Sequence, residues 1–147
     1  VGSAEEMYEA SIKEFEKVDC AVMCAAVADY TPVEVSASKI KKSDESFTIE
    51  LRKTKDIARE LGKVKGSRKI VGFALETDNE QLNAEKKLAE KNLDMIVLNS
   101  LRDEGAGFGH DTNKVTFIDS TKREELPLLQ KSEVAERIAD RIEKLLK

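Results

Sequence analysis

Three apolar runs bounded by polar or turn residues dominate the hydrophobic pattern of the chain. They occupy residues 20–28, 69–75 and 94–98. Apolar runs of this length between turn signals are typical of strands that are buried on both faces of a parallel sheet. The first run stops at Asp29 and the third at Asn99. The pattern therefore predicts three buried strands, each followed by polar residues.

Helical patterns alternate with these runs. Ser3 and Glu6 form an S-x-x-E capping box, which predicts the start of a helix. The other predicted helices occupy residues 56–64, 78–91 and 132–147. In the last of them, Val134, Ile138, Ile142 and Leu145 form one apolar stripe, so this helix is expected to pack on a sheet.

Two further patterns indicate more exposed strands. Residues 47–51 (FTIEL) alternate between apolar and polar, and residues 114–118 and 125–129 read as two strands joined by the polar turn DSTKRE. Strands that alternate with helices predict a parallel sheet covered on both faces. The expected fold is a Rossmann-like three-layer α/β/α domain over residues 1–147, with a mostly parallel sheet and an antiparallel hairpin at one edge.

Composition narrows the functional classes. The chain has 147 residues, of which 37% are charged, and its formal net charge is -4. A general nucleic-acid binder is usually basic, so we expect no nucleic-acid partner. No apolar run approaches the length of a membrane span, and no secretory signal opens the sequence. We therefore expect a cytoplasmic protein without a membrane partner.

The cysteines and the single histidine do not predict a metal site. In a strand, Cys20 and Cys24 would lie about 13 Å apart at about 3.3 Å per residue, which is too far for a disulfide. His110 is the chain's one histidine, so neither zinc binding nor Cys–His catalysis is expected. The segment GAGFG does not have the spacing of a dinucleotide-binding fingerprint.

Polar residues at the predicted strand ends are the candidates for binding chemistry. Ligands of open α/β sheets bind just beyond the carboxyl ends of the strands, where Asp29 and Asn99 are expected. Ten residues after Asp29, Lys39 opens a cluster that also contains Lys41 and Lys42. This arrangement suits an anionic phosphate substrate. From the pattern alone, Asp29 could equally cap the following turn, and the lysines could form a solvated loop.

The segment AAVADYTP followed by KIKK strongly resembles the bacterial phosphopantothenoylcysteine synthetase family. IVGFALET, KNLDMIVLNS and GFGHDTNKVTFI continue the resemblance in the family's order over nearly the whole chain. The resemblance implies a CTP-dependent ligation of 4′-phosphopantothenate with cysteine through an acyl-cytidylate intermediate. It also implies Mg²⁺ on the triphosphate, a homodimer in which parts of each site cross between subunits, and a phosphopantothenoylcysteine decarboxylase as a fused domain or separate protein.

The resemblance also assigns roles to individual residues. Lys39, the first lysine of KIKK, would be catalytic, because a positioned ammonium stabilises charge on the α-phosphate and on the departing pyrophosphate. The expected nucleotide- or substrate-binding residues are Ala25, Asp29, Lys39, Lys55, Asp56, Ile57, Ala58, Phe73, Lys87, Lys91 and Asn99. Lys55 stands where the family usually has proline. Lys87 and Lys91 form an i,i+4 pair of like charges, which would be tolerable with an anion bound between them.

One feature of the family is missing from this sequence. The glycine-rich N-terminal segment that family members use in nucleotide binding does not precede the first predicted helix. The sequence therefore reads as a fragment of the synthetase domain. The alternative is a non-catalytic nucleotide-binding or regulatory module derived from the same fold.

Overall fold

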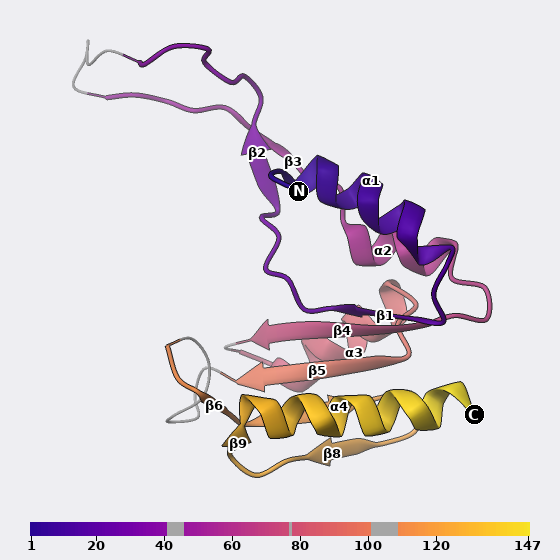
Figure 1. Ribbon diagram of the computed structural model, residues 1–147. Helices are drawn as coiled ribbons and strands as arrows, with labels where there is room; N and C mark the ends of the chain where they lie inside the picture. Colours follow the sequence, from indigo (N-terminus) through magenta and orange to yellow (C-terminus); the bar gives the residue numbers. More distant parts are fainter. Residues whose placement is uncertain (41–45, 77, 101–108) are drawn as a thin grey trace.

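A five-stranded mixed sheet forms the centre of the protein (Figure 1). The computed structural model describes residues 1–40, 46–76, 78–100 and 109–147. Within these residues the strand order is β1-β4-β5-β7-β8. Strands β1 (Cys20–Met23), β4 (Lys69–Glu76) and β5 (Met95–Ser100) are parallel, and β7 (Val115–Ile118) and β8 (Arg123–Glu125) add an antiparallel hairpin at one edge. The predicted Rossmann-like architecture is confirmed.

Helices cover both faces of the sheet, as the three-layer prediction requires. Helices α1 (Ala4–Phe15), α2 (Ile57–Lys63) and α3 (Glu80–Glu90) pack on one face, where Ile70 and Ile96 point. Helix α4 (Lys131–Leu146) packs on the other face, against Val71 and Val97 (Figure 1). Because neighbouring residues of a strand point to opposite faces, the apolar runs of β4 and β5 supply both cores.

Side-chain caps explain where two of the helices begin. Ser3 Oγ accepts a hydrogen bond of 3.1 Å from the backbone N–H of Glu6, as the capping box predicted, whereas the Glu6 carboxylate accepts from Gly2. Asp56 accepts from the backbone N–H of Arg59 at 3.1 Å and opens α2. Both caps satisfy amide groups that have no partner inside their helix.

The predicted strand at residues 20–28 is wrong in length and in burial. Strand β1 ends at Met23, and it lies at the edge of the sheet, where only β4 pairs with it. Val22 is 41% exposed, so β1 is not buried on both faces. The alanines that follow have little area to bury, and no strand formed by the described residues pairs with them. Asp29 therefore lies beyond the end of β1, directly before the next strand.

Residues 30–40 and 46–53 leave the body of the protein as an arm (Figure 1). At its base β2 (Tyr30–Pro32) pairs antiparallel with β3 (Leu51–Lys53). The predicted strand at 47–51 is wrong, because only Leu51 of that segment lies in a strand. Apolar side chains on the arm are exposed, including Val35 at 87% and Phe47 at 65%. The apolar residues of the alternating segment 47–51 are therefore exposed and do not form the buried face of a strand.

The second strand of the predicted hairpin is displaced toward the turn. We expected residues 125–129, whereas β8 covers Arg123–Glu125 and pairs with β7 from Thr116 to Ile118. The chain then turns into a short two-stranded ladder between β6 (Thr112–Asn113) and β9 (Leu129–Gln130). This ladder places β6 beside the start of α4.

Candidate functional site

A pocket of about 270 Å³ lies at the carboxyl ends of the parallel strands. Three of the predicted binding residues line it, namely Ala25 after β1, Phe73 in β4 and Asn99 in β5. Leu75 and Asn99 are paired in the β4–β5 register, so the strand ends are level with each other. This is the position at which open α/β sheets bind ligands. The expected convergence of the strand ends is therefore present.

Among the lining residues that the sequence interpretation missed, two carry an amide or a charge and come from outside the parallel strands. Asn113 comes from β6 and Lys131 from the first turn of α4. Asn113 is only 7% exposed, and its Nδ2 donates a hydrogen bond of 2.9 Å to Oδ1 of Asn99. The sequence did contain a signal for Lys131. A cation in the first turn of a helix is unfavourable next to the positive end of the helix dipole, and a bound anion would compensate it. The sequence around Asn99 and Asn113 contained no pattern that indicated their hydrogen bond.

Asp29, another predicted binding residue, lies at the base of the arm. The backbone N–H of Thr54 donates to the carbonyl of Asp29 at 2.9 Å, and Thr54 Oγ1 donates to the carbonyl of Ala28 at 2.7 Å. These bonds hold the segment before β2 against the start of α2. The Asp29 side chain is exposed, and Asp29 is not among the lining residues of the pocket.

Lys87 in α3 and Lys91 at its C-cap are each paired with a carboxylate, contrary to the sequence interpretation. Lys91 Nζ lies 2.9 Å from Oδ2 of Asp56, and Lys87 Nζ lies 2.5 Å from Oε1 of Glu76. Partial burial alone would raise the pKa of Asp56, but hydrogen bonds from Lys91 and from the Arg59 backbone lower it below its ordinary value. Asp56 caps α2, 35 residues before Lys91, and Glu76 ends β4, 11 residues before Lys87. A bound anion is thus not required to explain the lysine pair.

The predicted binding residues Lys55, Ile57 and Ala58 are not among the lining residues of the pocket. Lys55 pairs with Glu5 at 2.6 Å, and its ammonium lies 4.2 Å from the centroid of the Tyr8 ring. Ile57 is 5% exposed and belongs to the core beneath α1 and α2, and Ala58 is half-buried. Any contact of Ile57 or Ala58 with a ligand would have to come from the backbone.

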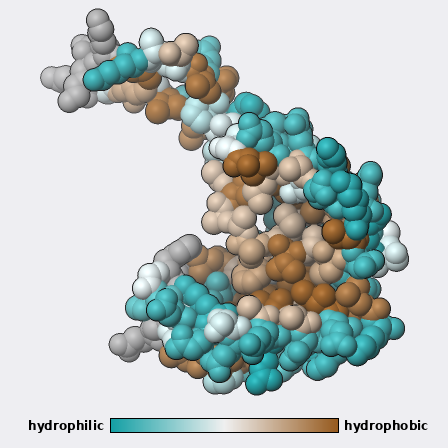
Figure 2. All heavy atoms as spheres, viewed as in Figure 1, coloured by the Kyte–Doolittle hydropathy of each residue, from teal (hydrophilic) through white to brown (hydrophobic). Residues whose placement is uncertain are grey.

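Lys39 lies on the arm, apart from the strand ends. Its side chain is exposed, and it is not among the lining residues of the pocket. Lys41 and Lys42 lie outside the described residues. Figure 2 shows a hollow between the arm and the body, with many brown and pale-brown atoms in its wall. Within one chain, the arm therefore holds the predicted catalytic lysine away from the residues that line the pocket.

Both cysteines are free, and neither belongs to a metal-binding cluster of described residues. Burial, followed by the charge of Asp94, raises the pKa of the Cys20 thiol, which disfavours the reactive thiolate. Among the described residues, no group of three or more His, Cys, Asp or Glu side chains could hold a metal ion. The helices formed by these residues are all too short or too polar to cross a membrane.

Comparisons with known proteins agree over the whole chain. The family model for the "DNA/pantothenate metabolism flavoprotein C-terminal domain" matches residues 1–146. A relative from an unknown prokaryotic organism, named "Cysteine/Cysteine sulfinic acid decarboxylase", is 54% identical over 99% of this chain and 40% of its own length. The "Coenzyme A biosynthesis bifunctional protein CoaBC" of Bacillus subtilis (strain 168) is 47% identical over 100% of this chain and 36% of its own length.

A solved structure shares the fold. The crystal structure of the C-terminal domain of "Coenzyme A biosynthesis bifunctional protein CoaBC" superimposes with a TM-score of 0.80 at 41% identity, covering 99% of this chain and 64% of that one. The chain thus spans about two fifths of the length of these curated relatives. Their names describe whole proteins, and neither name assigns an activity to the matched stretch.

Proposed function

Because the chain belongs to the family of DNA/pantothenate metabolism flavoprotein C-terminal domains, we propose that it ligates 4′-phosphopantothenate with cysteine in coenzyme A biosynthesis, using CTP. The observation that carries the proposal is the pocket at the strand ends. Ala25, Phe73 and Asn99 were expected to bind ligand from the sequence, and all three line this pocket. The relative from Bacillus subtilis, which is named for coenzyme A biosynthesis, supports the same pathway.

The proposed chemistry has two steps. The carboxylate of 4′-phosphopantothenate attacks the α-phosphorus of CTP, which forms the acyl cytidylate and releases pyrophosphate. The amine of cysteine then attacks the acyl carbon, which forms the amide and releases CMP. Activation is needed because a free carboxylate is a poor electrophile. The extra negative charge of the first step calls for a positioned cation.

Lys39 is the proposed source of that cation, and its place on the arm determines how it would act. In one chain Lys39 is exposed and does not line the pocket. We therefore propose that the protein is a homodimer in which the arm of one subunit carries Lys39 to the pocket of the other. The exposed apolar residues of the arm, such as Val35 and Phe47, support this interface, because contiguous exposed apolar surface marks interaction sites.

Mg²⁺ would enter with the nucleotide. The described residues offer no cluster of acidic side chains that would hold the ion by themselves. The ion would shield the triphosphate charge, and we assign no step of the reaction to it. The product would pass to a phosphopantothenoylcysteine decarboxylase, as a fused domain or a separate protein. A decarboxylase name on one relative, and a bifunctional name on another, support this partner.

The test is a product assay on the protein in its full-length context. CTP, 4′-phosphopantothenate and cysteine should together yield CMP, pyrophosphate and phosphopantothenoylcysteine, with less product when ATP or UTP replaces CTP. Omission of 4′-phosphopantothenate is the control, because it should remove the release of CMP. Binding of CTP without any product would instead favour the non-catalytic nucleotide-binding module.

A further inference from the structure

Asn113 presents a buried polar atom that nothing in the described protein satisfies. Its Nδ2 is used in the 2.9 Å hydrogen bond to Asn99 Oδ1, while its own Oδ1 is buried and has no partner within the described residues. Buried carbonyl oxygens are rarely left unpaired, because removing them from water without a replacement bond is unfavourable. Asn113 also lines the pocket at the strand ends. Its free oxygen is thus available to a ligand that enters this pocket.

The position of this oxygen is fixed by the fold. Asn113 belongs to β6, where it pairs with Leu129 of β9, and Asn99 belongs to β5, where it pairs with Val115. Both backbones are held by ladders, and the bond between the two amides fixes the orientation of the Asn113 carboxamide. A pre-positioned acceptor of this kind can discriminate between ligands that carry a donor at the matching point and ligands that do not.

The rest of the pocket restricts what can bind. Ala25, Phe73 and Leu75 give it apolar walls, and none of the described residues that line it is acidic. Among the described lining residues, Lys131 in the first turn of α4 is the one cation, and its side chain makes no hydrogen bond or ion pair with the described part of the chain. The lining therefore suits a ligand with an apolar or planar body, a neutral donor group for Asn113 and an anionic group for Lys131.

We propose that Asn113, held in place by Asn99, is a specificity-determining residue whose carboxamide oxygen accepts a hydrogen bond from a neutral N–H or O–H group of a substrate. This inference rests on the proposed function for the identity of the substrates. Two sources carry the required donor. One is the amino group of cytosine in CTP, and the other is the amide or hydroxyl of 4′-phosphopantothenate.

The test replaces Asn113 by leucine in the full-length protein, which removes the acceptor and keeps a side chain of similar size. Affinities for CTP, UTP and 4′-phosphopantothenate are measured by calorimetry, together with the thermal midpoint. We expect the affinity for one substrate to fall on the order of tenfold, and the thermal midpoint to fall as well because Asn99 Oδ1 loses its donor. A fall for CTP that also removes its advantage over UTP identifies the cytosine amine. A fall for 4′-phosphopantothenate alone identifies its amide or hydroxyl group as the donor.

Asn92→Leu is the matched control for an asparagine with a structural role. Asn92 Nδ2 donates to the Gly62 carbonyl at 2.9 Å, at the junction of α2 and α3, and Asn92 does not line the pocket. This variant should lower the thermal midpoint and leave all three affinities unchanged. The proposal is overturned if Asn113→Leu behaves in the same way, or if it leaves every affinity intact.

The outcome separates this inference from the proposed function. If the wild-type protein forms no phosphopantothenoylcysteine but Asn113→Leu still weakens the binding of one substrate, the inference stands and the ligase assignment falls. If the wild-type protein forms the product and Asn113→Leu has unchanged KM values for CTP and 4′-phosphopantothenate, the inference falls and the ligase assignment stands.

Discussion

Gly62 packs directly against the backbone of Lys91. A Cβ atom at position 62 would overlap the Lys91 carbonyl oxygen, so α2 and the end of α3 can approach this closely only because residue 62 has no side chain. The Lys91–Asp56 ion pair bridges the same two helices. The contact therefore fixes the position of α2, which in turn supports the base of the arm.

Gly62→Ala should destabilise the protein by about 2–3 kcal/mol, because the neighbouring atoms are backbone and cannot rotate away. The measurement is urea unfolding followed by circular dichroism. Gly2→Ala is the control, since a Cβ there would meet Glu6 at an ordinary 3.6 Å. Equal stability of the two variants would show that the helices can separate at little cost.

Asp119 should give the protein a dependence on acid pH. Burial alone would raise its pKa, but hydrogen bonds from Thr121 and Lys122, together with Arg141, bring the pKa below the ordinary value of 3.8. Arg141 lies 2.7 Å from Asp119, and both side chains are largely buried. A carboxyl group with a lowered folded-state pKa contributes stability above its unfolded pKa and loses it as the pH falls through the folded pKa.

Asp119→Asn should therefore cost about 2 kcal/mol at neutral pH and should flatten the loss of stability below about pH 4. Urea unfolding between pH 2 and pH 7 measures both effects. Asp140→Asn, on the exposed side of α4, is a suitable control and should keep the wild-type pH profile. An unchanged acid limb in Asp119→Asn would contradict the assignment.

Lys39→Gln should abolish turnover while leaving the fold intact. The change removes the cation and keeps most of the side-chain bulk, and loss of one charge-stabilising donor costs on the order of 10²–10³ in rate. Release of CMP and pyrophosphate measures the effect in the full-length protein. Because Lys39 is exposed on the arm, the thermal midpoint should not move. A normal rate in the variant would remove Lys39 from the proposed mechanism.

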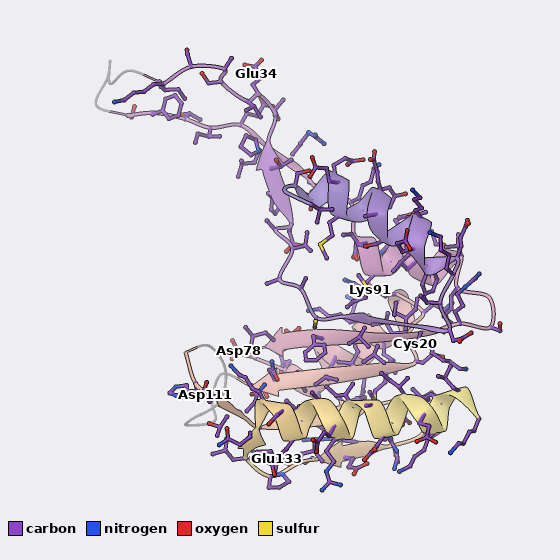
Figure 3. The ribbon with its side chains drawn as sticks, in the orientation of Figure 1. Cys20, Glu34, Asp78, Lys91, Asp111 and Glu133 are labelled. Carbon is purple, nitrogen blue, oxygen red and sulfur yellow. The ribbon has the colours of Figure 1, made fainter. Side chains whose placement is uncertain are left out.

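The arm should hold two subunits together. Phe47→Ser combined with Val35→Ser removes two of its exposed apolar side chains and should convert the dimer into monomers, as measured by sedimentation velocity. Glu34→Gln is the matched control, because it changes a polar residue of the same arm (Figure 3) and should leave the dimer intact. A wild-type monomer, or a double variant that remains dimeric, would rule out this interface.

The sequence predicted best those elements whose residues are buried by their own neighbours. The second and third apolar runs became β4 and β5 within about two residues at each end, and the apolar stripe of α4 packs on the sheet as expected. The strand predicted from the first run was wrong because an alanine-rich apolar segment at a sheet edge has the same sequence pattern as a buried strand. Residues 47–51 failed because their alternating side chains have no core to cover in the described chain.

The site was predictable only where residues stand at strand ends. Asn99 follows from the strand pattern together with the rule that ligands bind at carboxyl ends, whereas Phe73 and Ala25 were expected from the family resemblance. The Asn99–Asn113 pair could not be predicted, because it depends on which strands are neighbours. The interpretation of Lys87 and Lys91 as a pair of uncompensated charges was wrong for the same reason, because Glu76 and Asp56 approach them only in the folded protein.

The separation of Lys39 from the pocket has a genetic consequence. If the lysine of one subunit acts in the pocket of the other, each active site is built from two polypeptide chains, one supplying the pocket and the other supplying the arm. A Lys39→Gln allele and an allele with a defective pocket would each be inactive alone. Random mixing of their products would give half mixed dimers with one intact site each, or about a quarter of wild-type activity. Such complementation between alleles would reveal which chain each catalytic group serves.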